Sequence, residues 1–267
     1  MKDAHKLVVA ILLLAGMGQG QKHPMDNMDM SGSPSPGPAA VAATNPSAQT
    51  AVGQIDAATR VMHSHHMESG PHMRMTPMRE PRPGDLERAQ EVVEAAKRAM
   101  EKYKDYRNAL ADGYQIFLPN VPQPQYHFTN YGYGYEAAFH FNPEHPTSLL
   151  YEKTKDGGYT LMGAMYTAPK DASEADLDRR IPLSVARWHL HVNFCFPPKE
   201  RRAEMFQPNP KFGMAGSITT QEECDSNGGK FVPHLFGWMV HVYPYEKTPA
   251  AIWGMSTQDS MDHMHMH

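Results

Sequence analysis

The architecture follows from one run of eight residues, Trp188-His189-Leu190-His191-Val192-Asn193-Phe194-Cys195. In a β-strand, side chains alternate between two faces with a period of two. One face would then carry polar and sulfur-bearing side chains (His189, His191, Asn193 and Cys195). The other face would carry apolar side chains suited to a core (Trp188, Leu190, Val192 and Phe194). Because neutral imidazole is the commonest protein ligand for zinc and copper, this strand indicates a metal site.

A second strand with the same pattern is predicted at Leu235–Tyr243. Its apolar face carries Trp238, Val240 and Val242, and its opposite face carries Met239, His241 and Tyr243. If the two strands pair, His241 joins His189 and His191 on one surface. Three imidazoles from neighbouring strands are a suitable ligand set for zinc or copper.

A fourth ligand is expected from the segment Pro124-Gln125-Tyr126-His127, which places His127 in a loop. Asn193 is a candidate for orienting one of these metal ligands without binding the metal itself. The alternative for any single histidine is an ordinary hydrogen-bonded or exposed side chain, and this alternative is preferred for His140 and His145. Four further side chains are weaker candidates for the site: Glu152, His140, His145 and His234.

Residues 1–20 have the pattern of a secretory signal peptide, with a basic start at Lys2 and Lys6 and a short apolar run after it. Export to the periplasm or the medium is therefore expected, with no membrane span left after cleavage. The chain has two cysteines, and in an oxidising compartment Cys195 and Cys224 are expected to form a disulfide. A cysteine nucleophile and a thiolate metal ligand are the alternatives, although the sequence contains no CxxC motif.

Aromatic residues divide the chain, since all of them lie between Tyr103 and Trp253. Residues 21–83 are rich in Met, His, Pro and Ser, and such a segment is expected to be disordered because it has little apolar surface to bury. Residues 84–254 are expected to form one folded domain, followed by a second disordered tail at 255–267. The net charge of −4 and the absence of a basic cluster argue against nucleic acid as a partner.

The folded domain is predicted to open with an amphipathic helix capped by Asp85 and ended by Gly113. Its apolar stripe is Leu86, Ala89, Val93, Ala96 and Met100. Residues 114–147 are expected to be irregular. A hairpin is predicted from Ser148–Lys153 and Tyr159–Thr167, and short helices are predicted at Ser173–Arg179, from Pro197 to Met205 and at Thr219–Asn227. This mixture without a βαβ rhythm predicts an α+β fold with a mostly antiparallel sheet.

Methionine and histidine are concentrated near both ends of the chain. Residues 21–78 and 255–267 together hold 12 of the 20 methionines and 8 of the 16 histidines. Thioether sulfur is a soft ligand that favours Cu(I), and imidazole binds either state of copper. Both segments are therefore expected to capture copper loosely, and compositional drift is the alternative.

Several of these motifs together resemble a group of exported bacterial proteins of uncharacterised function. The resemblance covers most of residues 105–254 and rests on Ala111-Asp112-Gly113-Tyr114, His127 with Asn130, Pro146-Thr147-Ser148-Leu149-Leu150-Tyr151-Glu152, the run from Trp188 to Cys195, Cys224 with Gly228-Gly229, and Gly237-Trp238-Met239-Val240-His241-Val242-Tyr243. It implies the domain limits and the choice of histidines, but no reaction. In composition, the two tails resemble the Met/His-rich segments of periplasmic copper-resistance proteins.

The sequence therefore predicts an exported metal-binding protein with a histidine site for copper or zinc and copper-sequestering tails. One alternative is a metal-dependent enzyme, either a hydrolase or a copper oxidoreductase, with the Tyr-rich segment 126–135 lining its cleft. Another is a module that binds a cell-envelope ligand without a metal, through aromatic side chains that stack on sugars.

Overall fold

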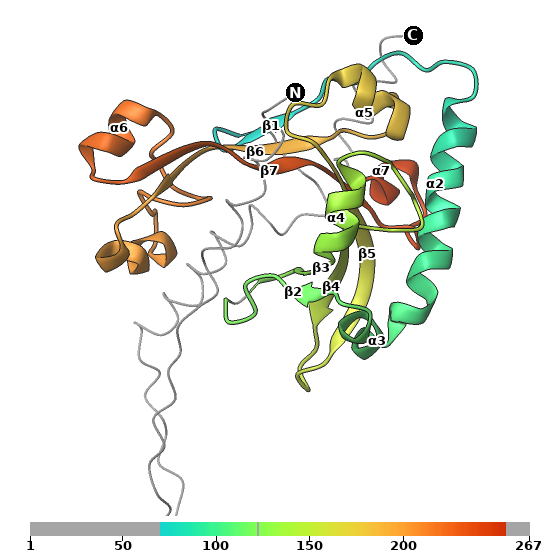
Figure 1. Cartoon of the computed structure of the whole chain (residues 1–267), viewed down its shortest axis with the longest axis horizontal. Coiled ribbons are helices and arrows are strands. Elements are labelled where there is room, and N and C mark those ends of the chain that lie inside the picture. Colours follow the sequence, from blue (N-terminus) through green and yellow to red (C-terminus); the bar gives the residue numbers. More distant parts are fainter. Residues whose placement is uncertain (1–69, 122, 255–267) are drawn as a thin grey trace, which may run out of the picture. The chain divides into compact units, whose positions relative to one another are not determined.

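A single seven-stranded antiparallel sheet organises the described part of the chain, residues 70–121 and 123–254 of a computed structural model (Figure 1). The strand order across the sheet is β1-β6-β7-β5-β4-β3-β2. The strands are β1 (Met73–Met75), β2 (Gln115–Ile116), β3 (Tyr126–Thr129), β4 (Ser148–Lys153), β5 (Tyr159–Ala168), β6 (His189–Phe196) and β7 (Lys230–Val242). With its N-terminal helix and several short helices, the α+β class predicted from the sequence is confirmed.

Helices surround this sheet. They are α2 (Asp85–Met100), α3 (Tyr106–Ala111), α4 (Tyr131–Ala137), α5 (Glu174–Arg180), α6 (Gln221–Ser226) and α7 (Pro249–Ile252), with 3-10 helices η2 (Glu101–Lys104) and η3 (Lys199–Phe206). Among the helices of residues 70–121 and 123–254, none is long and apolar enough to cross a membrane.

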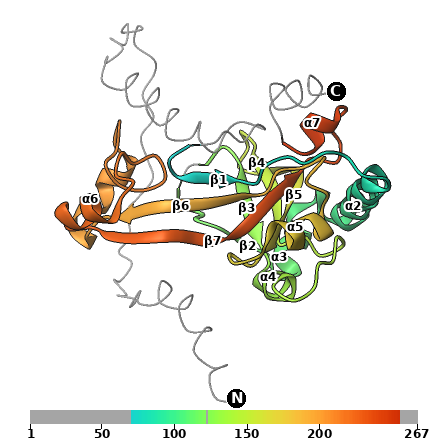
Figure 2. The ribbon, with the colours of Figure 1, turned by 90° about the horizontal axis from the view of Figure 1, so that it is seen from above.

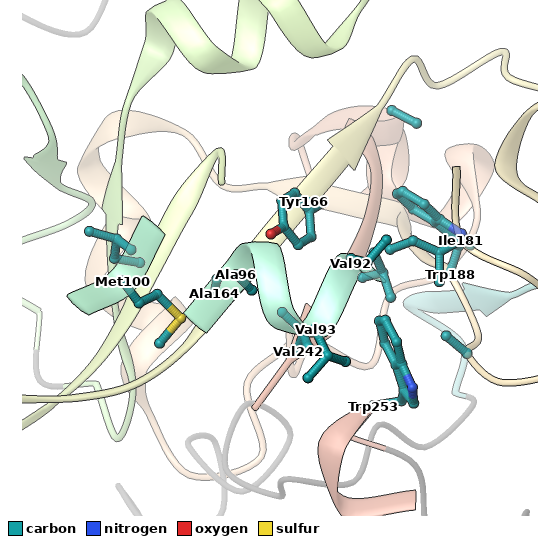
Figure 3. Close-up of a cluster of buried hydrophobic side chains, with 14 of the residues drawn as sticks. Val92, Val93, Ala96, Met100, Ala164, Tyr166, Ile181, Trp188, Val242 and Trp253 are labelled. Carbon is teal, nitrogen blue, oxygen red and sulfur yellow. The ribbon is translucent and has the colours of Figure 1, made fainter. Parts of the chain in front are cut away.

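The main hydrophobic core lies between α2 and one face of the sheet. Val92, Val93, Ala96 and Met100 of α2 face the sheet, where Figure 3 shows them beside a group of larger side chains. That group is Tyr166, Ile181, Trp188, Val242 and Trp253. The apolar face predicted for the two histidine-bearing strands therefore packs under α2, except for Phe194, which is described with the site.

Three details of the predicted first helix differ in the structure. Asp85 is the first residue of α2 and not its cap, because its carboxylate is occupied by Arg79 and other donors. Leu86 is 71% exposed and takes no part in the buried stripe. The helical segment is also not continuous to Gly113, since it passes through η2 and then α3, which Asp105 caps.

The predicted hairpin is confirmed as β4 and β5, and the helix predicted after Ser173 is α5, closed by a capping box between Ser173 and Asp176. Residues 114–147 were expected to be irregular, but they contain regular elements. They include β2, β3 and α4, where the Asn130 side chain accepts a hydrogen bond from the Tyr133 backbone N–H and caps the helix. His127 therefore lies on a strand and not in a loop.

The folded part also begins before residue 84. β1 pairs with β6, although its residues lie in the segment 21–83 that was predicted from composition to be disordered. The His72 ring contacts two backbone carbonyls, Gly216 O at 2.6 Å and Val192 O at 3.3 Å. Thr76 N donates to Trp188 O at 2.8 Å. These contacts explain why the prediction of disorder was wrong for β1 and the residues beside it. They order this part of the chain without the apolar side chains on which the prediction from composition depended. The expected signal peptide, the rest of the N-terminal segment and the tail at 255–267 lie outside the described residues.

The sheet is strongly curled, so that strands far apart in its order meet across its concave face. Three strand spacings separate β3 from β7, about 14 Å on a flat sheet. Nevertheless Tyr243 at the end of β7 donates a hydrogen bond to Gln125 Oε1 at 3.1 Å. Gly163 of β5 permits this curvature, because a Cβ there would lie 2.5 Å from Val242 O and 2.8 Å from the Tyr243 ring.

Beyond the main sheet, β6 and β7 continue as a two-stranded ribbon towards α6 (Figure 2). The predicted disulfide is confirmed here, joining Cys195 of β6 to Cys224 of α6. The two cysteines form a small second core with Phe212 and Ile218. Gly229 passes so close that a Cβ would lie 2.9 Å from Cys224 Sγ, so a residue without a side chain is required there.

Removal of the disulfide in a Cys195→Ala/Cys224→Ala variant is expected to lower the free energy of unfolding by about 2–3 kcal/mol. The cross-link spans 29 residues, and closing a loop of this size restricts the unfolded chain. Urea unfolding of the variant measures the loss, and wild-type protein unfolded in a thiol reductant is the matched control. Equal stability of the oxidised and reduced proteins would contradict this prediction.

Candidate metal centre

The concave face of the sheet collects histidines from three strands. His189 and His191 come from β6, His241 from β7 and His127 from β3. Directly opposed residues of an antiparallel pair point to the same face, and the pairs His189 with Met239 and His241 with Met165 place both histidines on this face. The shared surface predicted for His189, His191 and His241 is therefore present.

The alternation of β6 does not continue to its end as predicted. Asn193 has a φ of 59°, in the left-handed region that side chains rarely adopt. After this residue Phe194 is absent from the core under α2, and its ring lies 5.7 Å from His72 and 6.2 Å from His191. Asn193 itself donates to Pro71 O at 2.9 Å, so its expected role in orienting a ligand is not seen.

An irregularity in β7 lies opposite the two β6 histidines. His189 pairs with Met239 whereas His191 pairs with Leu235, so two extra residues of β7 lie between these pairs. Phe236 at the irregularity has a φ of 67°. At Gly237 a Cβ would collide with Ala168 O, which requires glycine where β7 approaches the end of β5. Such bulges are common beside functional sites, where they redirect side chains.

The four rings form a continuous cluster, here called the histidine cluster. The ring centroids of His189 and His241 are 5.1 Å apart, and those of His189 and His191 are 5.6 Å apart. His127 reaches the cluster across the curled sheet, with its ring 5.7 Å from that of His241. The structure therefore brings together all four histidines that the sequence predicted as ligands.

The ring orientations do not yet form a ligand shell. Within residues 70–121 and 123–254, no group of three or more His, Cys, Asp or Glu side chains is arranged to hold a metal ion. The rings of His189 and His241 are inclined by 76°, and those of His189 and His191 by 80°. A shared ion would therefore require the rings to turn about their side-chain torsions.

Hydrogen bonding separates the histidine cluster from other histidines of the fold. His145 is bonded to Glu136 Oε2 at 2.7 Å and stacks on Tyr133, consistent with the structural role preferred for it. In the cluster, the His127 ring is hydrogen-bonded to the backbone of Gln125. No hydrogen bond joins the rings of His189, His191 or His241 to another side chain or backbone group of the described residues.

Burial and mutual repulsion keep the histidine cluster neutral. Burial lowers the pKa of His127 to about 4, with a further contribution from His191. Burial also lowers the pKa of His191 to about 4 and that of His241 to about 3. His189 is 2% exposed, and its pKa is lowered well below 6.5 by burial and then by its three neighbours. The cluster is thus held in the form that can bind a metal.

Access to the histidine cluster is from the side of the half-buried rings. His189 forms the buried floor, while His127, His191 and His241 are each only partly covered within the described residues. His189 is therefore the most buried of the four rings.

The weaker candidates lie away from the histidine cluster. His234 is exposed on the part of β7 that pairs with Val192, and His140 is exposed after α4. Glu152 is exposed on β4, near enough to Tyr243 to affect its pKa. Sequence reasoning missed His72, which is buried beside Phe194, and of the methionines on the concave face it placed only Met239 there. Their cross-strand register was the missing information.

Comparison with known proteins adds no assignment. No protein-family model, no curated protein and no solved structure matches this chain.

Proposed function

We propose that this protein binds a transition-metal ion, copper or zinc, through His127, His189, His191 and His241. The observation that carries the proposal is the spacing of four neutral imidazoles on one sheet face. Two imidazoles bound to one tetrahedral ion through bonds of about 2 Å have ring centres roughly 5 Å apart. The neighbouring rings of the histidine cluster are 5.1 to 5.7 Å apart. Rotation of the rings about their side-chain torsions would bring donor nitrogens of neighbouring rings towards a common ion.

The hydrogen bonding also supports this proposal. Metal-bound histidines usually donate their second ring nitrogen to a carbonyl or carboxylate, which fixes the ring. His127 makes such a bond to the Gln125 backbone. The rings of His189 and His241 keep their nitrogens available to an ion, because they have no hydrogen-bond partner in the described part of the chain.

The expected location of the protein and its terminal segments also support the proposal. The disulfide is consistent with an oxidising compartment, and the pattern of residues 1–20 supports export. The Met/His-rich segments at both ends would deliver or sequester copper, binding it loosely through many weak ligands.

Metal analysis tests the histidine cluster. Full-length protein loaded with Cu or Zn and washed with a weak chelator is expected to retain about one ion per chain. A His189→Ala/His241→Ala variant is expected to retain none, because it removes the central pair of rings. His140→Ala, which changes an exposed histidine outside the cluster, is the matched control.

A second measurement distinguishes metal bound by the histidine cluster from metal bound by the terminal segments. An ion raises the unfolding temperature only when it binds the folded protein more tightly than the unfolded chain. Metal is therefore expected to stabilise wild type and His140→Ala, but not the double variant. Wild-type retention and stabilisation in the double variant, or no retained ion in wild type, would overturn the proposed function.

A further inference from the structure

Methionines gather on the same concave face as the histidine cluster. Met75 and Met239 pair with His189 from its two sides, Met73 pairs with His191, and Met165 pairs with His241. Opposed residues have Cβ atoms about 5 Å apart on the same face, so these side chains are direct neighbours of the imidazoles. Each of His189, His191 and His241 therefore has a methionine beside it on an adjacent strand.

The distribution of methionines differs between the two faces of the sheet. Of the buried methionines in residues 70–121 and 123–254, Met73, Met165 and Met239 are on the concave face and Met100 is in the core under α2. The core under α2 is otherwise filled mainly by aliphatic and aromatic side chains, with Met78 partly buried against it. Packing alone would not favour thioethers on one face.

Met239 is the best placed of these thioethers. It is directly opposite His189 on β6 and two residues before His241 on the same face of β7. Its side chain is 6% exposed and packs with Leu150, Met165 and Tyr243. The long, flexible methionine side chain can adjust its sulfur towards an ion held between these two rings.

The charge of the surroundings favours a monovalent ion. The residues that pair with His127, His189, His191 and His241 on neighbouring strands are all methionine or leucine, so none of them carries a charge. Imidazole and thioether are both neutral ligands, and the cost of burying an ion rises with the square of its charge. A site of this kind is better suited to Cu(I) than to Zn(II), because Zn(II) would lack a carboxylate or thiolate to offset its second charge.

We propose, building on the metal site above, that the ion bound by the histidine cluster is Cu(I) and that Met239 supplies a thioether ligand between His189 and His241. Met75 and Met165 flank the same two histidines and complete a soft surrounding for the ion. The terminal segments and the folded site would then prefer the same metal.

An anaerobic competition titration tests this inference on the full chain. Cu(I) and Zn(II) are each titrated against a chelator, for wild type and for Met239→Leu, which preserves volume but removes the sulfur. Cu(I) affinity is expected to fall at least about tenfold in the variant, while Zn(II) affinity stays unchanged. Met100→Leu, in the core under α2, is the matched control. The Cu(I)-induced rise in unfolding temperature is recorded in parallel, because it reports binding to the folded domain.

The outcomes separate the two proposals. Metal binding with equal Cu(I) affinity in wild type and Met239→Leu would overturn the thioether ligand but leave the histidine site standing. An equal loss in Met100→Leu would also overturn it, because the effect would then be one of packing. If wild type shows no stabilisation by either ion, the histidine site itself fails and the Cu(I) assignment fails with it.

Discussion

Acidification from pH 7 to pH 4 is expected to unfold the metal-free protein. Burial lowers the pKa of His127 and of His191 to about 4, from 6.5 for a free imidazole. Each of these groups binds its proton more tightly in the unfolded chain, so stability is complete above pH 6.5 and is lost as the pH falls towards 4. One such shift corresponds to roughly 3 kcal/mol at the acid end, which is a large part of the stability of many domains, and the lowered pKa values of His189 and His241 act in the same direction.

Urea unfolding at pH steps between 7 and 4.5, in excess chelator, measures this effect. The range avoids most of the titration of ordinary carboxylates, which are protonated nearer pH 4. His241→Gln removes one of the four groups and should flatten the profile, whereas the exposed His140→Gln should not. A stability that is constant between pH 6.5 and 4.5 would show that the rings are not buried in solution.

Replacing Asp85 by asparagine is expected to cost about 3–5 kcal/mol at pH 7. The carboxylate is 3% exposed and receives two hydrogen bonds from Arg79, at 2.6 and 3.0 Å, and one from Ser184 at 2.7 Å. Hydrogen bonds from Arg79, its largest partner, hold the pKa of this carboxyl far below its usual range. Asparagine removes the negative charge that Arg79 and Arg88 contact, and it leaves a buried neutral amide in place of a carboxylate that accepts several charge-assisted hydrogen bonds.

Thermal unfolding measures the loss, which for a domain of this size corresponds to a fall of about 10 °C or more in Tm. Glu144→Gln breaks the exposed pair between Arg98 and Glu144 and is expected to change stability by less than 1 kcal/mol. Arg79 also binds Asp178 of α5, so the network ties the segment after β1 to two helices. A Tm equal to that of wild type in Asp85→Asn would contradict the assignment of this network.

Strong periodicity made much of the fold predictable. β6 up to Val192 and the second half of β7 show clear alternation, the β4–β5 hairpin was predicted from its two strand segments, and Ser173 marked the cap of α5. The short elements carried no such signal. β3 has four residues and β1 has three, too few for a pattern, and both lie in segments whose composition is typical of loops.

The candidate site was predictable in its residues but not in its geometry. Alternation put His189, His191 and His241 on one face, and pairing of β6 with β7 followed from their similar patterns. The approach of His127 to His241 depends on the curl of the sheet, which Gly163 permits and which hydrophobic periodicity does not reveal. The left-handed backbone at Asn193 likewise has no signal in hydrophobic periodicity.

The edge strands of the sheet affect whether the protein aggregates at high concentration. β1 and β2 are the outermost strands, with three and two residues. Beyond β1, the outer side of β6 is also occupied, since Val192 N donates to His72 O and Gly213 N donates to Cys195 O. Few backbone groups of β1 and of the outer side of β6 therefore remain to recruit a strand from another molecule. Growth of fibrils by strand addition is disfavoured at these margins, whereas β7 before Trp238 has no second partner strand among the described residues.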